Sequence, residues 1–257
     1  MNPIEIELFE ESTWVDMFAA VPAPFAAAVG LGMVATPEAA LFYCQKIPFI
    51  HFNAAGSGLG LRRPLDAPAV ERLVAAYAAH GVAQPWVHVV PGIDDTALRS
   101  RGFAHSSSWD RVVRRPREAL TASATVTRVT ADRARDWGAF VDKIYGLPTS
   151  PWLLALAGRP GWQHYVVERD GELVAARSAF TRDGFTWMGI DAPVPGLMTR
   201  DFATDGEILR TIVADNPRSV VIADIESPSD TRSGPAYDIF SMLGFEVAYR
   251  RANLRLG

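Results

Sequence analysis

Cysteine is almost absent from this sequence. The 257 residues contain one, Cys44, so an internal disulfide framework of the kind found in small secreted domains is excluded. A single cysteine between Tyr43 and Gln45 is more typical of a small core residue than of a nucleophile. We therefore expect a protein of the reducing cytoplasm.

An excess of positive charge is also missing. The formal net charge is −4, and no lysine follows Lys143. Four arginines gather between positions 111 and 117, a composition expected of a solvated linker. The charge balance argues against nucleic acid as a partner.

The sequence has no uninterrupted apolar segment that reads clearly as a membrane span. Residues 17–37 carry no charge and are long enough to cross a bilayer, but two prolines and two glycines interrupt them. The first residues lack the basic region of a signal peptide. We expect short core elements here and no membrane association.

Several catalytic and metal-binding motifs are absent. The five histidines show no His-x-x-x-His spacing, and there is no Gly-x-Ser-x-Gly elbow and no Walker loop. Gly56, Gly58 and Gly60 superficially resemble a phosphate loop, yet Arg62-Arg63-Pro64 separates them from the helix predicted to begin at Asp66. Glycines are common at bulges and close strand approaches, so we predict neither a metal nor a phosphate site in this segment.

The residues that are present predict a substantial core, because 49% are hydrophobic and 21% charged. Three consecutive strands are expected in the second half, joined by turns at Asp170-Gly171 and Asp183-Gly184. Their ranges are His164–Glu168, Glu172–Phe180 and Phe185–Ile190. Prolines follow the third strand, and because proline cannot donate to a ladder, this strand is expected to diverge from its neighbour. A diverging strand followed by a helix N-terminus can hold a phosphate-bearing ligand.

A weak internal repeat divides the chain. Helix, Gly-Phe and strand follow one another at 98–113 and again at 240–250, with Gly102-Phe103 and Gly244-Phe245 as the corners. The repeat favours two copies of one unit, joined near residues 114–118. We predict domains at 1–118 and 119–257.

Four segments carry a resemblance to a known family. They are residues 158–165 (Gly-Arg-Pro-Gly-Trp-Gln-His-Tyr), 171–176, 184–189, and 243–245 with Tyr249-Arg250. Together they resemble the GNAT acetyltransferase superfamily and, more narrowly, a bacterial subgroup with two GNAT-like halves in one chain. The resemblance implies an α/β fold of the α+β type: a tandem GNAT-like acyl-CoA N-acyltransferase fold, with two mixed sheets flanked by helices. It makes residues 1–118 a degenerate half and gives the acyl-CoA site to residues 119–257.

The resemblance also implies how a cofactor would bind. Acetyl-CoA would be the co-substrate, with its pantetheine arm along the diverging strand and its pyrophosphate at the next helix. The matching residues are Met188, Ile190, Ala192 and Val194 for the arm, and Thr199 and Arg200 for the phosphates. The pattern of the family's phosphate loop, Arg/Gln-x-x-Gly-x-Gly/Ala, is absent from Pro195–Phe202, while Asp201 and Asp205 add negative charge.

Acyl transfer to an amine needs a base for the ammonium proton and an acid for the leaving thiolate. Asp224 and Glu226 are candidate bases on one face of a strand, unless they mark a solvated strand end. Phe240 stands where the superfamily usually has its tyrosine acid, so Tyr237 is the candidate acid, unless it only packs on a neighbour. The leading prediction is an acyl-CoA-dependent N-acyltransferase acting on an amine of a small molecule or peptide, as a monomer or homodimer. The alternative is a catalytically inactive GNAT-like protein that binds CoA or another ligand.

Overall fold

The computed structural model describes residues 2–194, 201–227 and 231–257. Its internal contacts divide the chain into two compact units. The first unit runs to Arg111 and takes in Ala248–Gly257 and a short segment that begins at Glu226. The second unit comprises Val112–Ile225 and Thr231–Val247. The units are therefore discontinuous in sequence, whereas the sequence suggested a single boundary after residue 118.

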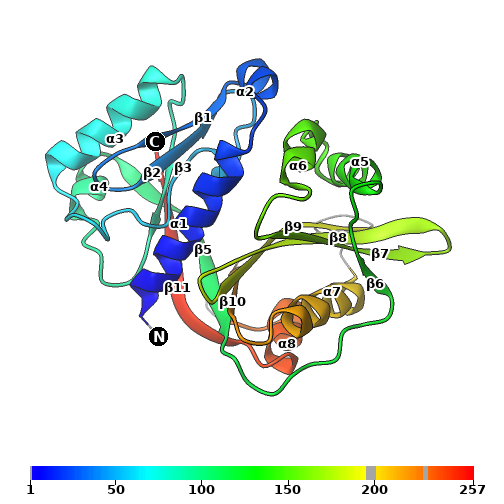
Figure 1. The fold of residues 1–257 in the computed structure, drawn as a ribbon. Helices are drawn as coiled ribbons and strands as arrows, with labels where there is room; N and C mark the ends of the chain where they lie inside the picture. The colour runs from blue at the N-terminus through cyan, green and yellow to red at the C-terminus, as the bar shows by residue number, and fades with distance from the viewer. Residues whose placement is uncertain (1, 195–200, 228–230) are drawn as a thin grey trace. The chain divides into compact units, whose positions relative to one another are not determined.

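The second unit places its helices on both faces of its strands (Figure 1). Tyr165, Ala179 and Met188 belong to a core that includes Ile208 and Ile239, so this strand face packs on α7 and α8. The opposite face packs on α5 and α6, with Trp137 at its centre. The elements are β6 (Val126–Arg128), α5 (Ala134–Tyr145), α6 (Ser150–Leu156), β7 (Trp162–Arg169), β8 (Glu172–Arg182), β9 (Phe185–Pro193), α7 (Phe202–Asp215), β10 (Val220–Glu226) and α8 (Pro235–Met242).

The first unit is built in the same manner. Leu41 of β2 faces a core with Leu73 and Tyr77 of α3, while its neighbour Phe42 stacks against Phe18 of α1. Alternate side chains of one strand thus meet helices on opposite faces. The elements are α1 (Pro3–Ala19), α2 (Ala23–Val29), β1 (Leu31–Ala35), β2 (Ala40–Cys44), the 3₁₀ turn Ile50–Phe52, β3 (Ala54–Ala55), α3 (Ala67–Ala79), β4 (Trp86–Val89) and α4 (Thr96–Ser100). Two further strands, β5 (Phe103–Arg114) and the last strand, β11 (Glu246–Leu256), lie mostly in this unit and have their remaining residues in the second.

The class is α+β, as expected, but the number of sheets differs from the expectation of two. Within the described ranges the strands follow one hydrogen-bonded order, β1-β2-β3-β4-β11-β5-β10-β9-β8-β7-β6. The sheet is mixed, since β3 pairs with β4 and β9 pairs with β10 in parallel, while β7, β8 and β9 are antiparallel. The strand from the end of the chain lies beside β4, a pairing that local sequence could not indicate.

One order of elements occurs twice along the chain. Helix, helix, three strands, helix, strand, helix and strand describe both α1 to β5 and α5 to β11. The last helix of each series ends before a left-handed glycine, Gly102 at φ 102° and Gly244 at φ 82°. A buried phenylalanine follows each glycine, Phe103 and Phe245. The Gly-Phe corners are therefore the same local structure in both series, since only glycine adopts such a φ without strain.

Several element boundaries depend on local hydrogen bonds. Helix α1 begins at Pro3, because the Asn2 side chain accepts a hydrogen bond from the Ile4 amide. Thr36 forms a turn between two strands, since its hydroxyl donates to the carbonyl of Ala39. Residues 50–52 form a 3₁₀ turn. In each case a capping or turn hydrogen bond decides the local structure.

Within the described residues, no single helix is long and apolar enough to cross a membrane. Helices α1 and α2 reach that length and composition only when taken together, across a bend of 100°. The same residues contain no group of three or more His, Cys, Asp or Glu side chains placed to hold a metal ion.

Candidate functional site

Strands β9 and β10 separate soon after they meet. Their parallel pairing covers Phe185 with Val220, Thr186 with Val221, and Trp187 with Ile222, and then ends. Strand β9 continues to Pro193 and β10 continues to Glu226. A wedge therefore opens between the two strands, with its apex at Trp187 and Ile222.

Strand β9 also carries a β-bulge inside this wedge. Its register with β8 shifts between the pairs Ser178–Gly189 and Ala176–Ala192. Ile190 adopts a φ of 52°, which is unusual for a β-branched residue. Two residues, Ile190 and Asp191, thus stand opposite Arg177 where a regular strand would place one.

The bulge changes which backbone groups face the wedge. The carbonyl of Gly184 accepts from the amide of Val220, so by alternation the backbone of Met188 also turns toward β10. Beyond the bulge, the amide of Val194 donates to the carbonyl of Val174 in β8, and Ala192 pairs with Ala176.

This geometry determines which of the predicted residues on β9 turn their backbone toward the wedge. The backbones of Ala192 and Val194 face β8 instead of the wedge, because the bulge shifts the alternation by one residue. Met188 keeps its predicted orientation, and Ile190 lies in the bulge. Asp191, which the sequence did not single out, joins them at the wedge. Thr199 and Arg200 lie outside the described residues.

The candidate catalytic side chains lie on opposite faces of the sheet. Val221, Ala223 and Ile225 of β10 belong to the core under α7 and α8, so Asp224 and Glu226 project to the opposite face. Asp224 is half-buried and Glu226 is exposed. Tyr237, in the first turn of α8, is half-buried and packs against that same core. Phe240 is buried and stacks edge-on against Phe245 at 5.0 Å, so that position is filled by an apolar ring.

The helix that follows β9 has an acidic start. Helix α7 begins at Phe202, because Asp201 caps it. The Asp201 carboxylate accepts from the amide of Ala203 at 3.0 Å and from the hydroxyl of Thr204 at 2.6 Å. The bond from Thr204 lowers the pKa of Asp201, so this cap stays charged. A charged carboxylate at a helix N-terminus satisfies the amides that an anionic ligand would otherwise use.

A buried arginine lies between the bulge and this helix. Arg177 Nη2 is 3.2 Å from an oxygen of Asp191 and 3.9 Å from one of Asp205. The Arg177 side chain is 7% exposed. On the surface nearby, Arg169 approaches Asp201 at 3.8 Å and Glu207 at 3.5 Å. Among the described residues, the end of the wedge near α7 therefore holds two arginines and four carboxylates. They are Arg169, Arg177, Asp191, Asp201, Asp205 and Glu207.

The corresponding place in the first unit is filled by its own side chains. Strand β3 pairs with β4 over only Ala54 and Ala55, and the glycines 56–60 follow. The Glu11 carboxylate lies where a side chain at Gly56 or Gly58 would stand, accepts from the amide of Ala40 and pairs with Arg62. These glycines thus allow the close approach of a helix side chain, the structural role that the sequence favoured over a phosphate loop.

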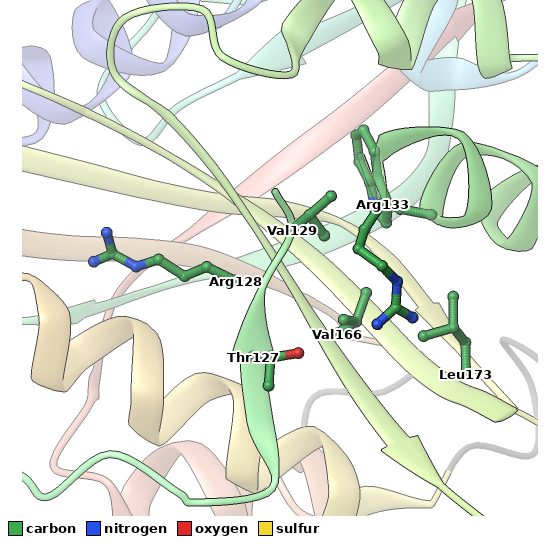
Figure 2. Close-up of a pocket in the computed structure, with 7 residues that line it drawn as sticks. Thr127, Arg128, Val129, Arg133, Val166 and Leu173 are labelled. Atoms are coloured by element: carbon green, nitrogen blue, oxygen red, sulfur yellow. The ribbon is translucent and has the colours of Figure 1, made fainter. Parts of the chain in front are cut away.

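A shallow depression on the second unit lies elsewhere. It is lined by β6, β7, β8 and α5, on the face that carries Trp137. Figure 2 shows Arg133 between Val166 and Leu173, with Arg128 pointing away. Both arginines are ion-paired, Arg133 to Glu168 at 2.9 Å and Arg128 to Asp215 at 2.8 Å. The depression therefore carries no chemistry comparable with the wedge.

No protein-family model matches the sequence, and no curated protein matches it. Solved structures do match. A GCN5-related N-acetyltransferase from Kribbella flavida has a TM-score of 0.53 and 18% identity over 75% of this chain and 77% of that chain. One from Sphaerobacter thermophilus has a TM-score of 0.52 and 16% identity over 72% of this chain and 64% of that chain. A functionally unknown conserved protein from Staphylococcus epidermidis has a TM-score of 0.52 and 12% identity over 87% and 92%. These likenesses show the fold, and a fold hosts more than one activity.

Proposed function

We propose that this chain, which has the fold of the GNAT acetyltransferases, transfers an acyl group from acyl-CoA to an amine in its second unit. The observation that carries the proposal is the wedge between β9 and β10, with the bulge at Ile190. An extended ligand can enter such a wedge as an added strand and bond to the backbone of Met188 and Asp191. The pantetheine arm, which has two amide groups, suits this form of recognition.

The side chains around the wedge support the chemistry. A ligand held in the plane of the sheet is accessible from both faces, so Asp224 on one face and Tyr237 on the other can act on the same reacting centre. Asp224 would take the proton from the attacking ammonium group, and Tyr237 would protonate the departing thiolate. Glu226 lies two residues further along the same face as Asp224 and is the alternative base.

The test begins with binding, measured by calorimetry with acetyl-CoA and with CoA. We expect saturable binding of acetyl-CoA, and release of free thiol when a panel of amines is added. Asp224→Asn should bind acetyl-CoA like the unmodified protein while its transfer rate falls about 10²- to 10⁴-fold, the range for loss of a general base. Glu226→Gln tests the alternative base: if this variant loses the rate while Asp224→Asn keeps it, Glu226 takes the proton. Absence of acetyl-CoA binding would reject the proposal.

One observation favours a second candidate, a catalytically inactive ligand-binding protein. The Ala203 amide at the start of α7 is capped by Asp201, and Asp205 follows in the first turn, so the described part of the phosphate end is acidic. Binding of CoA without thiol release for any amine would support this candidate over the enzyme.

The remaining features of the proposal rest on the family resemblance and, for the compartment, on the single cysteine. The acceptor would be an amine of a small molecule or peptide, and the protein would act as a monomer or homodimer in the cytoplasm. The buried state of Cys44, at 2% exposure, agrees with its interpretation as a small core residue.

A further inference from the structure

The wedge is bordered on one face by an aromatic row. Trp162 of β7 pairs with Phe180 of β8, and Phe180 pairs with Trp187 of β9. Residues paired across neighbouring strands share a face, and the rings are in contact. The centroids of Trp162 and Phe180 lie 5.0 Å apart, and those of Trp162 and Trp187 lie 6.1 Å apart, edge to face. The row ends at the wedge apex, because Trp187 also pairs with Ile222 of β10.

The next row along the same face is made of small or polar residues. His164 pairs with Ser178, and Ser178 pairs with Gly189. A Cβ at Gly189 would overlap the six-membered ring of the Trp187 indole. The indole therefore leans along β9, past the apex, and lies directly over the backbone of Gly189. At 5% exposure, Trp187 is held as part of the wall of the wedge.

On this basis, which rests on the proposed function, we propose that Trp187 sets the length of the acyl group. The phosphates would lie toward α7, which follows the far end of β9, so the thioester end of the ligand lies nearest the apex. There the acyl chain meets the indole seated on Gly189. Behind the indole stand Trp162 and Phe180, both buried, so a chain much longer than acetyl has no space on this face.

Trp187 and Gly189 act together as a pair. Gly189 has a negative φ and is needed for space, not for backbone conformation. Its missing side chain allows the indole to cover the apex. A smaller residue at 187 opens that space, while a larger residue at 189 pushes the indole away from it.

The test compares acyl-CoA binding by calorimetry for acetyl-CoA and hexanoyl-CoA. We expect the unmodified protein to prefer acetyl-CoA, and Trp187→Leu to shift the ratio of the two affinities toward hexanoyl-CoA by about tenfold or more, the range for an apolar pocket that gains or loses methylene space. Trp86→Leu is the matched control, because it makes the same change at a tryptophan of β4 in the first unit and should leave the ratio within about twofold. Trp187→Phe, which retains most of the packing, should give a smaller shift in the same direction and serves if Trp187→Leu does not fold.

The outcomes separate this inference from the proposed function. A ratio that changes in the Trp187 variants and not in Trp86→Leu supports the inference. If the unmodified protein binds both thioesters and the ratio is the same in every folded Trp187 variant, the acyl-length role is wrong while acyl-CoA binding stands. If the unmodified protein binds neither thioester, the proposed function fails and takes this inference with it.

Discussion

The largest group of buried charges lies in the first unit. Glu7 and Glu10 of α1 and Arg251 of β11 are at most 2% exposed. Arg251 Nη1 donates to Glu7 at 3.2 Å, to Glu10 at 2.5 Å and to the hydroxyl of Ser57 at 3.0 Å. Arg111 contacts the same Glu10 oxygen. Burial alone would raise the pKa of Glu10, but the two arginines and the bond from Ser57 hold it well below its ordinary value.

We expect Arg251→Leu to destabilise the protein by about 3–5 kcal/mol, because it leaves two buried carboxylates with only one close cation. Urea unfolding at neutral pH measures the change. Arg255→Leu, an exposed position on the same strand where the arginine stacks on Trp86 at 4.4 Å, is the control and should lose no more than about 1 kcal/mol. An equal loss of unfolding free energy in Arg251→Leu and Arg255→Leu would contradict the prediction that burial makes the loss of Arg251 more destabilising.

A second buried polar residue, His164, predicts acid sensitivity. Its ring stacks on Trp137 with centroids 4.0 Å apart, and Nδ1 lies 2.8 Å from the hydroxyl of Ser178. Burial lowers the pKa of His164 to about 4, compared with about 6.5 for an unfolded histidine. The unfolded chain therefore binds a proton that the folded chain does not, and stability must fall as the pH drops from about 6.5 toward 4.

The expected loss from this histidine alone is about 3 kcal/mol between pH 7 and pH 4. His164→Phe should remove that part of the pH dependence, and urea unfolding at both pH values measures it. His105→Gln, at an exposed position, should keep the pH dependence of the unmodified protein. His88, whose pKa burial lowers to about 3, adds acid sensitivity to all three proteins equally. A pH dependence that is unchanged in His164→Phe would show that this side chain does not contribute.

At the scale of elements, the bulge in β9 has a testable energetic signature. In a regular strand glycine is less stable than alanine by about 0.5–1 kcal/mol. At Ile190 the φ of 52° penalises any residue with a Cβ by about 1–2 kcal/mol.

We therefore predict that Ile190→Gly unfolds at a higher urea concentration than Ile190→Ala, by roughly 0.5–1 kcal/mol in stability. At Ile222, a regular buried position on β10, the order should be reversed: Ile222→Ala should be more stable than Ile222→Gly. Finding alanine more stable at both sites would mean that the bulge is absent in solution.

Helices α3 and α7 each begin with an aspartate cap, Asp66 and Asp201. Asp66 caps α3 by accepting from the amide of Ala69 at 2.7 Å, as its sequence predicts. Asp201 caps α7 in the same way, yet it also lies at the end of the candidate site. The first cap has only a structural role, whereas the second determines the charge that a ligand would meet.

At the scale of the whole chain, the end of the sequence completes the first unit. Ala248–Gly257 belongs to that unit and supplies Leu254 and Leu256 to its core. Tyr249 donates from its hydroxyl to Glu7 at 2.5 Å, and Asn253 lies 2.7 Å from His88 Nδ1. The first unit therefore has neither its full core nor its buried charge partners until the last residues are present.

We predict that deletion of residues 248–257 abolishes amide protection in α1 and α3 and leaves it in α7. Hydrogen exchange followed by mass spectrometry of peptides measures both regions in one sample. Deletion of Gly257 alone is the control and should leave both regions protected. Protection of α1 and α3 in the longer deletion would show that the first unit folds without the last strand.

Much of the second unit was readable from its sequence, because the signals there are local. The turns at Asp170-Gly171 and Asp183-Gly184 form as expected, each with two positive φ values, and they fix three consecutive antiparallel strands. The divergence of β9 from β10 was expected from the prolines that follow it. Alternation along β10 correctly placed Asp224 and Glu226 on one face, since Ala223 and Ile225 lie in the core on the other.

What the sequence by itself determined is therefore the set of turns, caps and alternating strands, since each depends on the φ preference or hydrogen bond of neighbouring residues. The tertiary structure decided the rest. The bulge at Ile190 has no cue in its neighbours and exists because β8 and β9 pair in two registers. The placement of β11 beside β4, and of Glu10 and Glu11 against residues 56–58, joins residues 40 to more than 160 positions apart. Such pairings depend on which surfaces can be buried together, and no local pattern in the chain records that choice.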